Sequence, residues 1–149
     1  MRRSIIVVAC LTVILFAGSL AAQTPLRIHA ASAEPVTGWN RMELGPQRAV
    51  WVNPTASLTS ADIASADPST DADRGTFIEV VFTEEGTRKM RELSNAQKNK
   101  LIAMVMNGRV IFAPTVRSEI GRECIITGSG PNGLTTTEVE DILAAIKRR

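Results

Sequence analysis

The stretch Ala103–Pro114, AMVMNGRVIFAP, constrains the fold more strongly than any other part of the sequence. Asn107 and Gly108 form the pair that a two-residue type I′ turn prefers, because both central residues of that turn need positive φ. Apolar runs flank the pair, and Pro114 removes a backbone donor where the second strand should stop. The sequence therefore predicts an antiparallel hairpin over residues 101–112.

Further strands and helices are predicted on both sides of this hairpin. Runs of β-branched and aromatic residues predict strands at residues 48–54, 76–83 and 123–127. The segment Leu58–Ala66 suggests a short helix with Thr59 or Ser60 as its N-cap, followed by a polar loop over residues 67–75.

Two longer helices complete the predicted fold. Thr83 is expected to cap the first, and Thr137 with Glu140 forms a capping box for the second. The order of elements predicts an α+β sandwich in which two main helices pack on one face of a mainly antiparallel sheet of about four to five strands, a ferredoxin-like arrangement.

The N-terminus has the pattern of an export signal. Arg2 and Arg3 precede a long apolar run and then small residues, which predicts a signal peptide over residues 1–21. The alternative is an uncleaved anchor over residues 4–22, since about 20 apolar residues can span a bilayer. In both cases the remainder is expected outside the cytoplasm, periplasmic or secreted, and it meets the membrane only through this segment.

The sequence after this signal divides into two segments. Residues 22–46 carry three prolines and show no sustained period, so we expect a flexible tether there and a folded domain over residues 47–149. The full chain has 17 basic and 15 acidic residues, and loss of Arg2 and Arg3 leaves the rest formally neutral. A nucleic-acid partner is therefore not expected. Cys124 becomes the one remaining thiol and is expected to be a buried structural residue.

One sequence motif suggests a nucleotide site but is better explained as a turn. Gly128, Gly130 and Gly133 spell G-x-G-x-x-G between a predicted strand and a predicted helix. In a dinucleotide site the helix starts within the glycines, so that its N-terminus meets the pyrophosphate. Here Pro131 and Asn132 extend a turn before the helix, and we expect no cofactor.

Catalytic and metal sites are not expected either. Asp67, Asp71 and Asp73 lack the spacing of a calcium loop and are interpreted as a solvated loop. The single histidine, His29, falls in the expected tether, so no histidine is available on the domain to activate a nucleophile or bind zinc. The sequence thus predicts a protein that is not an enzyme.

The ordered set of segments FTEEGTRKMRELS, LIAMVMNGRVIFAP, ECIITGSG and LTTTEVEDILAAI resembles one known module. That module is the head subdomain of the first large extracytoplasmic domain of SecD and SecDF, accessory subunits of the Sec protein-export machinery. The resemblance covers about residues 48–148. The matching positions are Thr83, Glu85, Gly86, Leu93, Ser94, Gly108, Ala113, Pro114, Ile126 and Gly128, and Asn107 stands where the family usually has aspartate.

The resemblance implies a binding role and assigns mainly structural roles to the family positions. In the family the head contacts the emerging preprotein and moves relative to a base subdomain, driven by proton flow through membrane helices. Two functions follow for this chain. The first is binding of unfolded or translocating polypeptide, with Sec translocon components as further partners, in support of export. The second is an extracytoplasmic interaction or structural module that uses the same fold for another partner.

Overall fold

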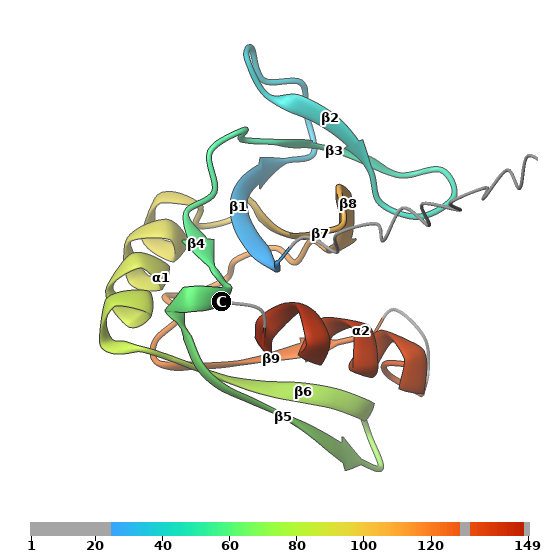
Figure 1. Cartoon of the computed structure of the whole chain (residues 1–149). Helices are drawn as coiled ribbons and strands as arrows, with labels where there is room; N and C mark the ends of the chain where they lie inside the picture. The colour runs from blue at the N-terminus through green and yellow to red at the C-terminus, as the bar shows by residue number, and fades with distance from the viewer. Residues whose placement is uncertain (1–24, 129–131, 148–149) are drawn as a thin grey trace, which may run out of the picture.

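Two antiparallel sheets and two α-helices make up the described part of the protein (Figure 1). The computed structural model describes residues 25–128 and 132–147. The elements are β1 (Arg27–Ser32), β2 (Asn40–Glu43), β3 (Ala49–Val52), β4 (Leu58–Thr59), the 3₁₀ turn η1 (Ser60–Asp62), β5 (Ile63–Asp71), β6 (Gly75–Phe82), α1 (Glu84–Ala96), β7 (Leu101–Met106), β8 (Arg109–Phe112), β9 (Glu123–Thr127) and α2 (Thr136–Lys147). Within these residues no helix is long and apolar enough to cross a bilayer.

The strands form two separate sheets. The large sheet has the order β2-β3-β1-β7-β8, with β4 also paired to β1, and the small sheet has the order β5-β6-β9. The α+β class is confirmed, but the expectation of one sheet is wrong, and the ferredoxin-like arrangement is not confirmed. The chain changes direction at η1, so β4 joins the large sheet whereas β5 pairs with β6.

The expected tether over residues 22–46 is wrong for its described part. β1 lies between β3 and β7, and its residues Ile28, Ala30 and Ala31 are buried. The prolines that suggested a tether fall outside the strands that they flank, before β1, between β1 and β2, and between β2 and β3. The predicted signal peptide or anchor lies outside the described residues.

The segment from Leu58 to Gly75 also differs from its prediction. The expected helix is one 3₁₀ turn, and the expected polar loop is mostly strand β5, paired with β6 over nearly its whole length. Pairing with the apolar strand β6 therefore overrides the local preference for a helix. Only residues 72–74 form the turn, where an Asp71 carboxylate oxygen accepts hydrogen bonds from the backbone N–H groups of Asp73 (3.0 Å) and Arg74 (2.6 Å).

The helices begin where short polar side chains can bond their free N–H groups. The hydroxyl of Thr83 accepts a hydrogen bond from Gly86 N–H at 3.0 Å, so the predicted cap of α1 is confirmed. The capping box of α2 is Thr135 with Glu138, rather than Thr137 with Glu140. The sequence TTTEVE offers both pairs at the same spacing, and the earlier one is used.

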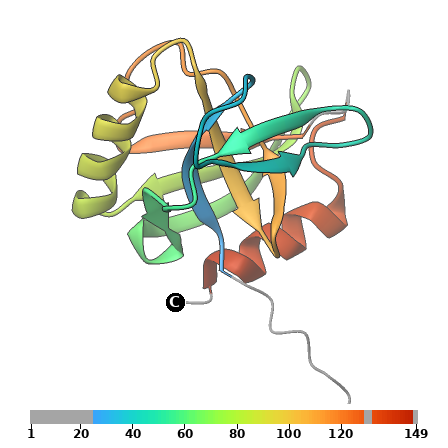
Figure 2. The same cartoon turned by 90° about the horizontal axis from the view of Figure 1, so that it is seen from above.

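One main core joins both sheets and both helices. In Figure 1, α2 lies between the large sheet and the small sheet, and Figure 2 shows α1 and α2 apart from each other, α1 at the left and α2 at the lower right. The buried cluster takes Ile28 and Ile102 from the large sheet, Val80 from the small sheet, Met90 from α1 and Ile142 from α2. A second cluster around Ala31, Val50, Val52, Ala103 and Val110 fills the opposite side of the large sheet.

Candidate functional site

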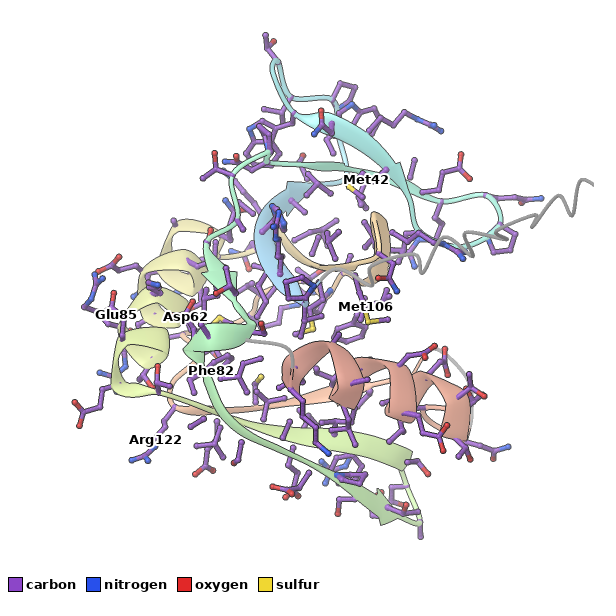
Figure 3. The ribbon with its side chains drawn as sticks, viewed as in Figure 1. Met42, Asp62, Phe82, Glu85, Met106 and Arg122 are labelled. Atoms are coloured by element: carbon purple, nitrogen blue, oxygen red, sulfur yellow. The ribbon has the colours of Figure 1, made fainter. Side chains whose placement is uncertain are left out.

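A hollow of about 390 Å³ lies between β8, the end of β9 and the start of α2, and we call it the groove. Each element contributes apolar side chains to its lining. They are Met106, Val110 and Phe112 from the hairpin, Ile126 from β9, Leu134 from the turn before α2, and Ile142 from α2. Met106 is labelled in Figure 3, where it lies next to α2. Most of these apolar side chains are buried and form the floor of the groove, while polar residues such as Asn107, Thr127 and Glu138 complete its lining.

The β7–β8 hairpin shapes one wall of the groove. Asn107 and Gly108 have φ values of 52° and 71°, so the predicted two-residue turn is confirmed. The pairing shifts between Met104 and Val105, which leaves Ile111 as an extra residue on β8. Such a bulge bends its strand and redirects its side chains, and Ile111 lines the groove.

Two open sheet edges border the groove. β8 is the terminal strand of the large sheet, and β9 is the terminal strand of the small sheet. A terminal strand has one row of N–H and C=O groups that no neighbouring strand pairs with, and such a row can bond an added strand. The arrangement therefore offers backbone hydrogen bonds beside an apolar lining.

Charges of both signs stand at the rim. Arg109 extends from β8, whereas Glu138 and Asp141 extend from α2, and all three are exposed. A carboxylate oxygen of Glu138 accepts hydrogen bonds from the N–H and the hydroxyl of Thr135, at 2.7 and 2.8 Å. An apolar interior with a polar rim is the usual composition of a protein-binding surface.

The predicted family positions fall into two groups. Asn107 and Gly128 line the groove, Gly108 completes the hairpin turn, and the carbonyl of Pro114 accepts a hydrogen bond from Ile102 N–H at 3.1 Å. Asn107 and Gly128 therefore lie at the groove, Gly108 forms the turn beside it, and Pro114 takes part in pairing at the far end of the hairpin, while the remaining three lie at the start of α1.

Thr83, Glu85 and Gly86 lie together at the start of α1. Figure 3 labels Glu85 on this helix and the buried Asp62 beside it. The Asp62 carbonyl accepts a hydrogen bond from Thr83 N–H at 2.9 Å, and its carboxylate pairs with the Lys89 ammonium at 2.8 Å. A Cβ atom at Gly86 would overlap the Asp62 carbonyl oxygen. Thr83 and Gly86 therefore hold α1 against the turn η1.

Glu85 points to solvent and pairs with a neighbour on the same helix. The hydrogen bonds from the guanidinium of Arg88, at 2.6 and 3.0 Å, lower the pKa of the Glu85 carboxyl. The side chain lies in the first turn of α1, where negative charge is favoured by the helix dipole. Its contacts are those of a helix-end residue.

Gly128 and Gly133, the two described glycines of the G-x-G-x-x-G motif, allow backbone segments to approach closely. Gly133 has φ of 75°, and a Cβ there would overlap the Thr76 carbonyl oxygen. A Cβ at Gly128 would likewise overlap the backbone of Gly133. Thr76 bonds the backbone on both sides of Gly133, through Asn132 at 3.0 Å and Leu134 at 2.7 Å. The motif holds the turn against β6, while Gly130 lies outside the described residues.

His29 and Cys124 have the surroundings of structural residues. His29 belongs to β1 rather than to a tether; it is 6% exposed, and its Nδ1 donates to the Asn53 carbonyl at 2.8 Å. Burial raises the pKa of the Cys124 thiol from 9.0 to about 11. Among residues 25–128 and 132–147, no three His, Cys, Asp or Glu side chains are grouped as a metal ion requires.

The groove was not recognisable from the sequence. Its lining residues have the same local pattern as core residues, because each lies on the apolar side of a strand or helix. Asp62 was also missed, since a buried aspartate in a predicted helix has no local signature. The one sequence signal close to the groove is the Asn107-Gly108 hairpin turn, because Asn107 lines the groove.

The fold and the groove define an α+β domain suited to non-covalent binding of other molecules. The chain belongs to the SecDF P1 head subdomain family, whose profile matches residues 37–145. The predicted resemblance is therefore confirmed, and it begins earlier than expected, within the segment interpreted as a tether.

Relatives and solved structures agree with this family. The chain is 33% identical over 92 residues to the protein translocase subunit SecDF of Thermus thermophilus, which covers 61% of this chain and 12% of that protein. It is similar to the structure of SecDF in the super-membrane-facing form, with a TM-score of 0.59 and 22% identity over 83% of this chain and 18% of the other. A second structure, of a membrane component SecDF that enhances protein export, gives a TM-score of 0.59 and 21% identity over 82% of this chain and 61% of the other. The chain thus matches a small part of the full relatives, and the family associates it with protein translocation.

Proposed function

We propose that this domain binds extended polypeptide in the groove and that it does so outside the cytoplasm, in support of Sec-dependent protein export. The observation that carries the proposal is the apolar lining between two open strand edges, β8 and β9. Membership in the SecDF P1 head family supports the link to export. Translocating chains and components of the Sec translocon are the proposed partners.

The groove offers two kinds of interaction to an unfolded chain. A segment that adds to the β8 edge forms backbone hydrogen bonds that do not depend on its sequence. Its alternate side chains then point toward Ile126 and Ile142. Full burial of one large aliphatic side chain contributes roughly 1.5–3 kcal/mol. A site of this kind binds many apolar segments weakly, as a protein that contacts chains during export requires.

We infer that the domain acts by binding rather than by catalysis. The described lining of the groove contains neither histidine nor cysteine. His29 is engaged with a backbone carbonyl, and the raised pKa of Cys124 keeps its thiol protonated at neutral pH. In this proposal the protein contacts the membrane only through the N-terminal segment, residues 4–22, if that segment is not cleaved.

Photo-crosslinking in cells tests the proposal. A photoreactive residue replaces Asn107 in the groove, and a matched probe replaces Glu92, which is exposed on α1 and does not line the groove. We expect the groove probe to give adducts with many exported chains and with translocon subunits, and the α1 probe to give far fewer. A single folded protein crosslinked at Asn107 would instead support the second function, a module for one fixed partner. Equal patterns at both positions would refute the groove as the binding site.

A further inference from the structure

The small sheet has a second face, which lies opposite the main core. Ile78, Val80 and Phe82 of β6 point into the core, so their alternate neighbours point the other way. In Figure 1 the small sheet forms the lower boundary of the molecule, with α2 on its upper side. The register assigns nine residues to this outer face: Ser65, Asp67, Ser69, Phe77, Glu79, Val81, Glu123, Ile125 and Thr127.

The outer face carries two apolar side chains that belong to neither buried cluster, the half-buried Val81 and the exposed Ile125. Phe77 lies on the same face but is buried at 5% exposure, with the guanidinium of Arg74 over its ring at 5.2 Å. Ile125 is 39% exposed, and it is the one large apolar side chain classed as exposed among the described residues. Val81 and Ile125 border a hollow of about 440 Å³ together with Glu79 and Glu123. The face thus presents apolar surface beside two carboxylates.

The charges on this face are arranged against the stability of the sheet. Asp67 lies directly opposite Glu79 in the β5–β6 ladder, and like charges in that position destabilise a sheet. Glu123 lies opposite Val81, which makes it a diagonal neighbour of Glu79. Within the described part of the chain, none of these three carboxylates forms an ion pair. Such a local conflict, with no benefit to the fold, points to a role in recognition.

We propose that the outer face docks a basic, amphipathic segment of a partner protein. The aliphatic stem of a lysine or arginine packs along Val81 and Ile125, and its cationic head meets Glu79 and Glu123. The partner then neutralises the repulsion between Asp67 and Glu79 and covers the exposed Ile125. Charge complementarity selects this occupant, because the face offers carboxylates next to apolar side chains. This surface is separate from the groove and adds to the proposed function.

A binding experiment with the full chain tests this proposal. The probe is a fluorescent peptide of alternating lysine and valine, and its control is a peptide of alternating glutamate and valine, both followed by anisotropy. The test variant is Glu79→Gln with Glu123→Gln. The matched variant is Glu140→Gln with Glu34→Gln, which removes the same charge from exposed positions elsewhere. Circular dichroism verifies that each variant is folded.

We expect the lysine–valine peptide to bind the wild-type chain. The test variant should raise the Kd for this peptide roughly fivefold, because it loses two exposed ion pairs. Ile125→Thr should weaken binding as well, whereas Asp141→Asn at the groove rim should not. Equal weakening by the matched variant would mean attraction to net charge and would overturn the proposal. Loss of binding in Asp141→Asn would assign the peptide to the groove instead. Self-association of the chain through Ile125, detected by sedimentation, would also overturn it, because the occupant would be a second copy.

Discussion

Replacement of Gly86 by alanine should destabilise the domain, although the residue lies in a helix. Its φ is not in the left-handed region, so helix propensity alone predicts that alanine stabilises α1 by about 1 kcal/mol. The added Cβ, however, would overlap the Asp62 carbonyl oxygen, which belongs to the buried turn η1. Helix propensity therefore favours alanine at this position, whereas packing against Asp62 disfavours it.

The structure indicates that packing is the larger effect. Displacement of Asp62 by the new methyl group resembles overpacking, which costs about 1–3 kcal/mol. It also weakens the hydrogen bond from Thr83 N–H at 2.9 Å and the pairing with Lys89 at 2.8 Å, each a contribution of about 1 kcal/mol. After the gain in propensity is subtracted, the free energy of unfolding should fall by roughly 2–4 kcal/mol.

Urea unfolding followed by circular dichroism measures this change. The midpoint of Gly86→Ala should fall by about 1–2 M if the slope is near 2 kcal/mol/M. The matched control is Gly121→Ala, because a Cβ at Gly121 meets nothing within 4 Å and its φ is not positive. The control should be unchanged or slightly more stable. If Gly86→Ala were as stable as the wild type, the assigned packing of α1 against η1 would be refuted.

Four further predictions follow from single contacts. Thr83→Ala removes the cap of α1 and should lower the free energy of unfolding by about 1 kcal/mol in urea titrations, with Thr83→Ser nearly neutral. Gly108→Ala forces a side chain to adopt φ of 71° and should cost about 1 kcal/mol by the same assay; no loss would contradict the type I′ turn. Phe112→Ser should reduce crosslinking of polypeptide at the groove severalfold while the fold persists in circular dichroism. Burial raises the pKa of the Cys124 thiol from 9.0 to about 11, so unfolding releases a proton in this range and stability should fall as the pH rises from about 9 to 11. Urea titrations at about pH 8 and pH 10 should show a smaller fall for Cys124→Ala than for the wild type.

Local signals predicted the elements that depend on local chemistry. The Asn107-Gly108 turn, the Thr83 cap and the strands β3, β6, β7, β8 and β9 all follow from neighbouring residues, and the structure has each of them. Turn and cap geometry is set within a few residues, so their sequence signatures are strong. The family resemblance rested on these same features.

The features that the sequence did not predict, strand β1 and the separation into two sheets, depend on strand pairing between distant parts of the chain. β1 has the sequence RIHAAS, with two alanines and a histidine, and its apolar character is weak without knowledge of its neighbours. Its position between β3 and β7 buries these small residues against both strands. The separation into two sheets also depends on partners far along the chain, so no local pattern could have shown it.

The groove could not be predicted for the same reason, because its lining residues are far apart in the sequence. Phe112 and Ile142 come from a strand and a helix about 30 residues apart, and each has the pattern of an ordinary core residue. Only the packing of α2 between the sheets shows that their side chains share a hollow. The carboxylates of the outer face could be read as solvated residues for the same reason, until the register placed Asp67 opposite Glu79.

The early start of the fold sets how far the domain could move from a retained N-terminal anchor. The predicted N-terminal anchor ends at Ala22, and Leu26 is already buried at 1% exposure. A fully extended chain advances at most about 3.5 Å per residue, so four residues span no more than about 14 Å. If the anchor is retained, this short connection keeps the domain close to the bilayer surface.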